Sequence, residues 1–549
     1  MSLTILAATL LLVGANIHTL ENDRPRAEAL VARDGVIVYV GSEAEARARA
    51  GAGAREMNLR GKTVLPGFTD AHGHLGGLGA LERGALDLRD AKTFDEVIEA
   101  VKDEVKKRKP GEWILGSRWD HESWPGRELP MHHQLSDVAR GNPVWLDRVD
   151  GHMGIANRAA MERAGITGET PSPAGGSILH DATGKPSGIF VDNAMELVTK
   201  FIPAGARGSY GDLVLAAQAR CFAVGLTTVH DAGIEPSEIQ TLQGLADEGR
   251  LKLQVYAMVA ASQAGLEWIE GNRPIVGYGA DHQLTVRTVK LFADGALGSR
   301  GAWLLAPYAD RPLDDGANPY FGLPVTPPDT LRKQVAAAMS RGYQVATHAI
   351  GDRGNRETLD AYEAAARSYA PRTLEALRAR IEHAQVLSAQ DVPRFARLGV
   401  IASMQPTHAT SDMRWADRRI GVERLRGSYA WASLLRSGAR LAFGSDFPVE
   451  APDPLAGIHA AVTRQDAHGE PIGGWNASER VTRMEAVRGF TEWAAYAAFE
   501  ENVKGTLAVG KRADLVVLSR DILTCEPAEI LTTRIEMTLV GGEVVFSAR

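Results

Sequence analysis

Two histidines in the first part of the chain have the spacing of a pair of metal ligands. His72 and His74 stand in the segment TVLPGFTDAHGHLGG, directly after an apolar run. If this run is a β-strand, side chains two positions apart point to the same side, and both imidazoles lie at its end. Two neutral imidazoles make half of a typical metal site. A single HxH pair is a weak signal, so the prediction depends on further ligands elsewhere.

Four more polar residues lie in or at the end of apolar runs farther along the chain. They are Lys290 in RTVKLFADG, His348 in YQVATH, His383 in ARIEH and Asp446 in LAFGSD. Taken singly, each has an ordinary explanation, such as a hydrogen-bonded core histidine, a helix N-cap or a buried ion pair. Four of them at successive predicted strand ends, together with the HxH pair, favour a metal site.

Alternating strand and helix patterns predict the elements that must position these residues. The expected strand runs are 64–72, 226–233, 284–295, 343–352, 379–385, 400–408 and 440–448. Helical patterns lie between them, for example at 329–342 and 355–370. Seven or eight such units predict an α/β protein with a (β/α)8 TIM barrel, whose active site lies at the carboxyl ends of the strands. An open doubly wound sheet is the alternative, although no glycine-rich phosphate-binding fingerprint supports it.

Both chain ends and one internal segment depart from this alternation. Residues 1–62 and 503–549 contain short β-runs broken by glycines, which predicts a small β-sandwich domain built from both termini. Residues 63–502 would then form the barrel. Within them, residues 77–225 are too long for one βα unit and are expected to form an insertion over the barrel mouth. The run PVWLDRVD in this insertion is the candidate for a missing barrel strand.

Composition narrows the range of partners and compartments. The 549 residues include 44% hydrophobic and 23% charged side chains and carry a formal net charge of −7, with no basic run. A nucleic-acid partner is therefore not expected. Only Cys221 and Cys525 are present, which argues against a disulfide framework and fits a cytoplasmic protein. The apolar segment from Leu3 to Val13 is too short to cross a membrane and is expected to be the first β-strand.

Taken together, the motifs resemble the metal-dependent amidohydrolase superfamily, and more narrowly its YtcJ-like branch, which includes N-substituted formamide deformylases. The similarity lies in DAHGHL, VKLFADGALGSRGA, THAIGDRG, IEHAQ, GSDFPV and the tail KGTLAVGKRADLVVL. It implies a barrel with a small β-sandwich. It also implies a hydrolase of an amide or related non-peptide C–N bond that acts through a hydroxide held between two metal ions. One departure is Gly73, which replaces the usual β-branched residue between the two histidines.

The resemblance also implies a role for each motif residue. The implied ligands are His72, His74 and Asp446 for one ion and His348 and His383 for the other, with Lys290 bridging both as a carboxylated lysine. Asp446 would also act as general base and then as general acid. Zinc is the expected metal, with iron, manganese and cobalt as alternatives. A carbamate forms only on a neutral amine, so burial must lower the pKa of Lys290.

Residues around the ligands are expected to support them or to bind substrate. His230 and Asp231 end the run GLTTVHDAG and could orient a ligand through hydrogen bonds, unless they only form a turn. His152 and Arg148 belong to RVDGH, which resembles a characteristic segment of the family and could face the substrate.

Two other residues are further candidates for substrate contact. Arg300 could bind a substrate carboxylate, and Trp119 could line the pocket. A structural arginine and a core tryptophan are the alternatives. His121 and the pair His132 and His133 have no strand-end context and are expected on the surface.

Three functions follow from these patterns. The first is the binuclear hydrolase of a small-molecule substrate, for which deformylation, deacylation of N-acyl amino acids and opening of cyclic amides are not separable. The second is a mononuclear deaminase of the same superfamily, which needs a glutamate such as Glu357 after the His348 strand and has no use for Lys290. The third is a non-catalytic scaffold, although such relatives usually lose their ligands. The oligomeric state is open, with a homodimer as one candidate.

Overall fold

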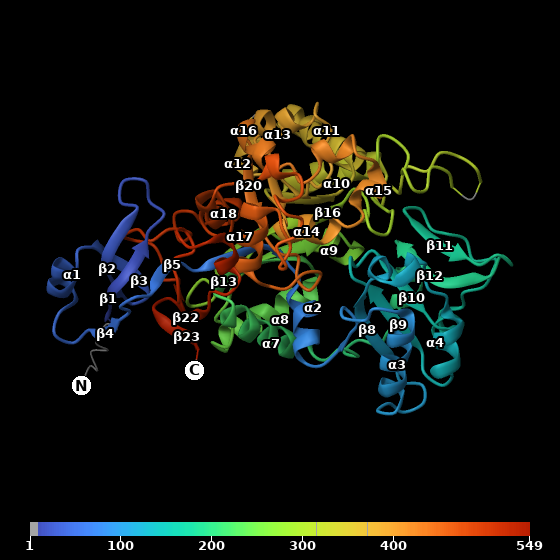
Figure 1. Ribbon diagram of the computed structural model, residues 1–549, viewed down its shortest axis with the longest axis horizontal. Coiled ribbons are helices and arrows are strands. Elements are labelled where there is room, and N and C mark those ends of the chain that lie inside the picture. Colours follow the sequence, from blue (N-terminus) through green and yellow to red (C-terminus); the bar gives the residue numbers. More distant parts are fainter. Residues whose placement is uncertain (1–8, 315, 370–371, 549) are drawn as a thin grey trace.

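The computed structural model describes residues 9–314, 316–369 and 372–548. A central barrel lies between a sheet built from both chain ends, called here the terminal sheet, and a second sheet, called the insertion sheet (Figure 1). The part of the predicted first strand that falls within residues 1–8 lies outside the described residues.

Eight parallel strands form the barrel. In order around it they are β6 (Phe68–Gly73), β13 (Leu226–Ile234), β14 (Gln254–Ala260), β16 (Leu284–Phe292), β17 (Gln344–Ala349), β18 (Arg380–His383), β19 (Ile401–Met404) and β20 (Arg440–Phe443). A parallel bridge between Gly73 and Phe447 joins the two ends of the series. The short strand β15 (Ile275–Tyr278) pairs antiparallel with β16. The predicted barrel is confirmed, and its strand ends converge on one face.

The barrel strand that the sequence analysis missed is β14. It is buried almost throughout and pairs with β13 and β16. The run Val144–Arg148, proposed for the barrel, instead forms β9 of the insertion sheet, so that assignment was wrong. Both runs are nearly continuous apolar stretches, because a strand buried on both faces shows no alternation of polar and apolar residues.

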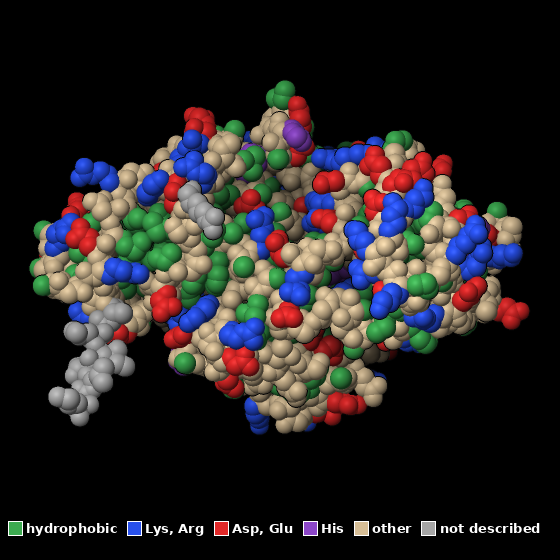
Figure 2. All heavy atoms as spheres, turned by 90° about the horizontal axis from the view of Figure 1, so that it is seen from below, with side chains coloured by type: hydrophobic (Ala, Val, Ile, Leu, Met, Phe, Trp, Pro, Cys, Tyr) green, Lys and Arg blue, Asp and Glu red, His purple; other side chains and the backbone are tan. Residues whose placement is uncertain are grey.

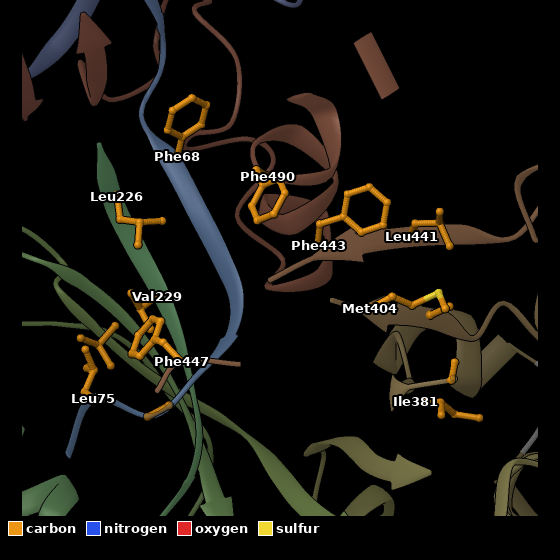
Figure 3. Packing of buried hydrophobic residues seen from close by; sticks show 14 of the residues in the cluster. Phe68, Leu75, Leu226, Val229, Ile381, Met404, Leu441, Phe443, Phe447 and Phe490 are labelled. Atoms are coloured by element: carbon orange, nitrogen blue, oxygen red, sulfur yellow. The ribbon is translucent and has the colours of Figure 1, made fainter. Parts of the chain in front are cut away.

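Helices fill the segments between the barrel strands. They are α2 (Leu75–Glu82), α7 (Tyr210–Ala223), α8 (Pro236–Asp247), α9 (Gln263–Gly271), α10 (Pro328–Ser340), α11 (Asp352–Tyr369), α12 (Arg372–Leu377), α13 (Val392–Leu398), α14 (Pro406–Asp412), α15 (Ala416–Ile420), α16 (Trp431–Arg436), α17 (Pro454–Thr463), α18 (Arg483–Gly489) and α19 (Glu492–Ala497). In α10 the buried residues Leu331, Val335 and Ala338 recur at helical spacing, so one face packs on the barrel. The rings of Phe443 and Phe490 pack with centroids 5.9 Å apart between β20 and α18 (Figure 3).

Both chain ends contribute to the eight-stranded terminal sheet, which helix α1 (Glu43–Ala50) contacts. Its strands are β1 (Thr9–His18), β2 (Arg26–Arg33), β3 (Val36–Gly41), β4 (Arg55–Asn58), β5 (Thr63–Pro66), β21 (Leu515–Leu518), β22 (Ile535–Val540) and β23 (Glu543–Ser547). The predicted strand 64–72 therefore divides at Gly67, with β5 in the terminal sheet and β6 in the barrel. A Cβ atom at Gly67 would lie 2.4 Å from the Thr227 side chain, so this crossing needs glycine.

The insertion has a six-stranded sheet of its own. Its strands are β7 (Leu86–Asp87), β8 (Ile114–Trp119), β9 (Val144–Arg148), β10 (Met153–Ala156), β11 (Gly176–His180) and β12 (Pro186–Asp192). Its helices are α3 (Phe94–Val105), α4 (His132–Val138), α5 (Arg158–Ala164) and α6 (Glu196–Thr199). The expected range 77–225 also contains α7 and most of α2, which pack against each other beside the barrel.

Basic and acidic side chains are interspersed over the face seen in Figure 2. Among the described residues, no helix combines the length and the apolar composition that crossing a bilayer needs.

Candidate metal centre

The six predicted ligands converge at the carboxyl ends of the barrel strands. They lie in or directly after five of these strands: His72 in β6 and His74 just after it, Lys290 in β16, His348 in β17, His383 in β18 and Asp446 in the loop after β20. Donor atoms of His72, His383 and Asp446 all lie within 4.8 Å of one another. Lys290 Nζ lies 3.1 Å from His72 Nε2. This collection of nitrogen and carboxylate donors suits a divalent transition metal.

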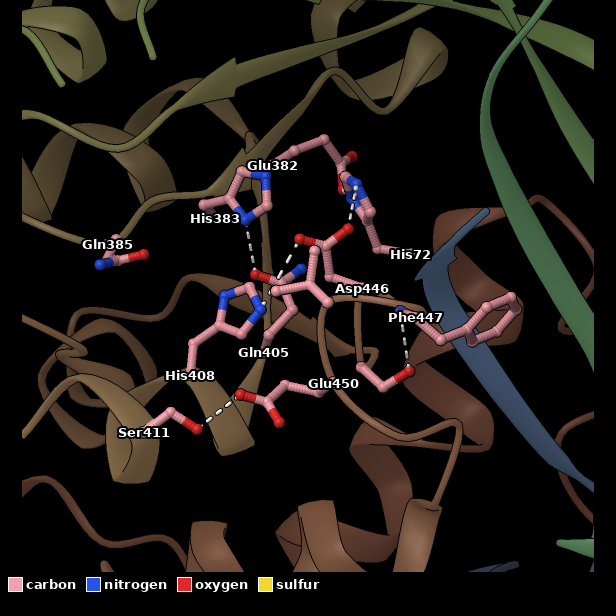
Figure 4. Close-up of polar contacts among 12 residues, drawn as sticks. His72, Glu382, His383, Gln385, Gln405, His408, Ser411, Asp446, Phe447 and Glu450 are labelled. Carbon is pink, nitrogen blue, oxygen red and sulfur yellow. Dashed lines mark hydrogen bonds and ion pairs between the residues drawn. The ribbon is translucent and has the colours of Figure 1, made fainter. Parts of the chain in front are cut away.

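A buried acidic residue that the sequence analysis missed orients His72. Glu382 Oε2 lies 2.5 Å from His72 Nδ1, which leaves Nε2 to face the ligand cluster (Figure 4). Arg380 donates to Glu382 Oε1 over 2.7 Å, and all three side chains are buried. The signal was present in the run ARIEH, because Arg380 and Glu382 are two residues apart and share one side of a strand.

The second pair of histidines is held in the same way. His383 Nδ1 lies 2.8 Å from Gln405 Oε1, so its Nε2 is free for a metal (Figure 4). His348 Nε2 lies 3.4 Å from the carbonyl oxygen of Gly295, which leaves its Nδ1 free.

His383 and Asp446 have φ angles of 74° and 59°. A non-glycine residue in this region costs of order 1–3 kcal/mol, which the surrounding fold must offset to aim these side chains.

Burial keeps the imidazoles of His72, His348 and His383 neutral, as metal binding requires. It lowers the pKa of His72 to about 4 and the pKa values of His348 and His383 well below their ordinary value. Burial also lowers the pKa of Lys290 to about 8. The amine is therefore far closer to its neutral form at pH 7 than an exposed lysine would be.

The carboxylate of Asp446 stays ionised despite its burial. Burial by itself raises the pKa of Asp446, but the hydrogen bond from His74 and the nearby His72 and His383 lower it well below its usual range. The His74 Nε2 atom lies 3.1 Å from Asp446 Oδ1.

The two residues expected to support the ligands do so indirectly. His230 Nδ1 accepts a hydrogen bond of 3.0 Å from Arg380, so it contacts the buried arginine–glutamate pair rather than a ligand. Asp231 accepts hydrogen bonds of 3.1 Å from the Leu75 amide and 3.0 Å from the Tyr210 hydroxyl. It therefore fixes the start of α2, directly after the HxH pair.

The insertion contributes two of the predicted substrate residues. The ring of His152 lies 4.7 Å from that of His348, and its Nδ1 lies 2.7 Å from Asp192 Oδ1. Arg148 is buried, and its charge is balanced by contacts of 2.6 Å to both Asp120 and Asp150. Both His152 and Arg148 line the cavities at the ligand cluster.

Trp119 and Arg300 are not brought to these cavities. Trp119 is buried in the hydrophobic core of the insertion and donates its indole N–H to a backbone carbonyl. Arg300 pairs with Asp310 at 2.9 Å. Neither side chain lines the two cavities at the ligand cluster. His121 and His132, expected on the surface, are buried, His121 against the Arg148 guanidinium.

Two adjoining cavities of about 520 and 370 Å³ open at the cluster and share His152, His348, His383 and Asp446. One more histidine, His408 on α14, lines the larger one and was missed. Its Nε2 lies 3.6 Å from Asp446 Oδ2 and has no hydrogen-bond partner in the described part of the chain. The run VIASMQPTH carried the same signal as the other ligand runs, a histidine shortly after a strand.

The glycine between the two histidines has a tertiary explanation. A Cβ atom at Gly73 would lie 2.4 Å from the Phe447 ring, so a β-branched residue does not fit here. We expect Gly73→Val to lower the free energy of unfolding by about 1–3 kcal/mol through overpacking, and to weaken metal uptake. Urea unfolding and metal analysis would measure both effects. Adding Phe447→Leu should restore part of the loss, and a Gly73→Val protein as stable as the parent would refute this explanation.

The amino-acid sequence is similar to a known protein family and to several of its members. The sequence profile of the amidohydrolase family matches residues 55–546. The chain is 35% identical to the protein LONG AFTER FAR-RED 3 of Arabidopsis thaliana, over 98% of this chain and 92% of that protein. It is 32% identical to YtcJ of Bacillus subtilis, over 97% and 98% of the two chains. It is 28% identical to the N-substituted formamide deformylase of Arthrobacter pascens, over 97% of each.

A solved structure extends the similarity to the fold. An uncharacterized metal-dependent hydrolase from Pyrococcus furiosus superposes with a TM-score of 0.72 at 29% identity, covering 94% of this chain and 100% of that one. The family profile spans nearly the whole chain, including every residue of the ligand cluster. The chain belongs to the amidohydrolase family.

Proposed function

We propose that the protein hydrolyses an amide or related non-peptide C–N bond with the help of two divalent metal ions. The observation that supports this most directly is Lys290, a buried amine with a lowered pKa that lies 3.1 Å from His72 Nε2 within a cluster of buried histidines. A mononuclear site has no role for such a lysine. Carboxylation would turn it into an anionic ligand able to reach two cations.

The donor set fits this pair of ions. His72, His74 and Asp446 would hold one, His348 and His383 the other, and carboxylated Lys290 both. Zinc suits these ligands, and iron, manganese or cobalt would accept the same set. When bound, the ions would polarise the scissile carbonyl and lower the pKa of a water molecule toward about 7.

The protein's own side chains would move the protons. Asp446 Oδ1 faces His74, whereas Oδ2 lies only 3.6 Å from His408, so Oδ2 is the oxygen available to accept a proton from the attacking water. The same oxygen would pass the proton to the leaving nitrogen. Burial lowers the pKa of His152, but its contact with Asp192 outweighs this and raises the pKa above its ordinary value. His152 can therefore donate a hydrogen bond to the carbonyl oxygen.

The deaminase alternative loses its supporting residue. Glu357 lies on α11 and pairs with Arg332 at 3.2 Å, and it does not line either cavity. The scaffold alternative would not need the buried hydrogen bonds that orient His72 and His383. A small-molecule substrate, a cytoplasmic location and a homodimer remain predictions.

Metal analysis combined with a substrate panel tests the proposed function. We expect the purified protein to bind two equivalents of zinc and to hydrolyse members of a panel of N-formyl amines, N-acyl amino acids, cyclic imides and dipeptides, with dipeptides the poorest. One equivalent together with release of ammonia from a nucleobase would favour the deaminase. A protein that takes up no metal would favour the scaffold.

Carboxylation of Lys290 is expected to depend on pH with a midpoint near 8. Only the neutral amine attacks CO2, losing a proton as the N–C bond forms. With a pKa of about 8, its neutral fraction rises from about one tenth at pH 7 to about nine tenths at pH 9. The rate of zinc uptake by metal-stripped protein, measured at fixed dissolved CO2 between about pH 6.5 and 9.5, should follow this curve. A midpoint near the ordinary lysine value of 10.5 would contradict it.

A further inference from the structure

We propose that the substrate is an amide of a cationic amine with an extended apolar acyl group. The acyl group would occupy the smaller cavity, and the amine would extend through the larger cavity to Asp412. This inference rests on the proposed amide hydrolysis and specifies its substrate class. Water adds to the carbonyl carbon, the C–N bond breaks and the nitrogen takes a proton, which gives a carboxylic acid and a diamine.

The smaller cavity is shaped for an apolar group. Beyond the ligands, its lining includes the apolar residues Ala80, Leu81, Ala85, Leu115, Phe292 and Pro448. The charged residues that also line this cavity are paired: Arg207 with Asp147 at 3.0 Å, Arg118 with Asp87, and Arg148 with Asp150. At about 370 Å³, this space lies in the range of small-molecule sites, whereas the hydrogen atom of a formyl group would leave it empty.

The larger cavity is lined by a carboxylate for which the described part of the chain provides no ion-pair partner. Its buried or half-buried arginines are already paired, Arg89 with Glu450 at 2.5 Å and Arg148 with two aspartates. Asp412 also lines this cavity, but it forms no ion pair with any described residue. Burial raises the pKa of Asp412 to about 6, so the carboxylate is still ionised at neutral pH.

Asp412 is held in place with one oxygen unused. Its Oδ2 accepts hydrogen bonds from Gln385 Nε2, over 3.0 Å, and from the Tyr429 hydroxyl. No described donor contacts its Oδ1. Asp412 is half-buried, so its ionised carboxylate is only partly solvated, and an ammonium group with several N–H donors would supply a partner.

The orientation of the substrate follows from α14. His408 and Asp412 are four residues apart on this helix, so they share one face, which lines the larger cavity. His408 Nε2 lies beside Asp446 Oδ2, the oxygen assigned to protonate the leaving nitrogen (Figure 4). The leaving amine therefore extends along α14 toward Asp412, and the acyl group takes the other cavity.

This arrangement disfavours two substrate classes. A formamide would leave the apolar cavity unfilled. An N-acyl amino acid would place its carboxylate in the cavity that contains Asp412, and two like charges at close range repel each other.

A matrix of nine amides tests the inference on the zinc-loaded full-length protein. Formyl, acetyl and hexanoyl groups are each attached to 1,4-diaminobutane, butylamine and 4-aminobutyrate, and kcat/KM is measured for each. We expect kcat/KM to rise by up to about fourfold per added methylene. We also expect the cationic amides to exceed the neutral ones by about tenfold, as for a hydrogen-bonded charge, and the anionic ones to be poorest.

Two variants separate the cavities. Asp412→Asn should abolish the preference for the cationic amine and leave the hexanoyl-to-acetyl ratio unchanged. Leu81→Trp should abolish the hexanoyl preference and leave the amine preference unchanged. Asp417→Asn, at an exposed carboxylate on neighbouring α15, is the matched control and should change neither ratio.

The outcomes distinguish this inference from the proposed function. Preference for formamides or for the anionic amides, or an Asp412→Asn protein with unchanged ratios, would overturn the inference while leaving amide hydrolysis in place. Because each ratio is measured within one variant, a partly folded protein does not obscure the result. If none of the nine amides nor the wider panel were hydrolysed, the proposed function itself would fail.

Discussion

Replacing Lys290 by alanine is expected to lower kcat/KM for amide hydrolysis by more than about 100-fold, the upper end of losses seen for residues that only orient a ligand. The same change should lower bound metal from two equivalents to one or fewer. The reason is geometric: Lys290 is the only lysine proposed for the cluster, and both ions would share it. Metal analysis of the purified variant and steady-state kinetics measure the two effects separately.

Chemical rescue by a small carboxylate tests the bridging role of Lys290 directly. The truncated side chain leaves a space beside His72 Nε2, and acetate or propionate should enter it, supply a bridging carboxylate and restore part of the activity. Lys333→Ala, at an exposed lysine on α10, is the matched control and should retain both metal and activity. Two equivalents of metal and an unchanged rate in Lys290→Ala would rule out the bridging role.

Asp446→Asn is expected to lower kcat by about 10²–10⁴-fold, the contribution usual for general acid–base catalysis. An amide cannot accept the proton from the attacking water, although its oxygen can still approach a cation. The pKa of Asp446 is held well below its usual range by His74 and the neighbouring histidines. The acid limb of the wild-type pH–rate profile should therefore lie at low pH and vanish in the variant.

A neighbouring aspartate provides the control for this variant. Asp453 caps α17 by accepting a hydrogen bond of 2.9 Å from the Leu455 amide, and asparagine caps helices equally well. Asp453→Asn should therefore leave both stability and kcat unchanged. An Asp446→Asn enzyme that kept the wild-type rate would exclude Asp446 as the proton carrier and leave only a structural role.

The sequence by itself was enough to predict the barrel fold and the candidate metal ligands at the ends of its strands. Polar residues that end continuous apolar runs are informative, because a strand buried on both faces can accommodate them only at its end. The runs ending at His348, His383 and Asp446 followed this rule, and their alternation with helical patterns identified the fold class. The rule extends to His408, because the apolar run predicted as a strand over 400–408 ends at Met404 and His408 follows it on α14.

The tertiary structure alone decided which apolar run completes the barrel and what surrounds the cluster. β14 and β9 look alike in sequence, and only their pairing partners assign them to different sheets. The contact between His72 and Glu382 joins residues 310 positions apart. The run ARIEH places Glu382 on the same side of its strand as Arg380, but only the fold identifies His72 as its partner. The location of the Trp119 side chain is likewise determined by packing, since an aromatic residue fits a hydrophobic core and a substrate pocket equally well. Side-chain type and spacing are local properties, whereas pairing, burial and cavity walls arise only when distant segments pack together.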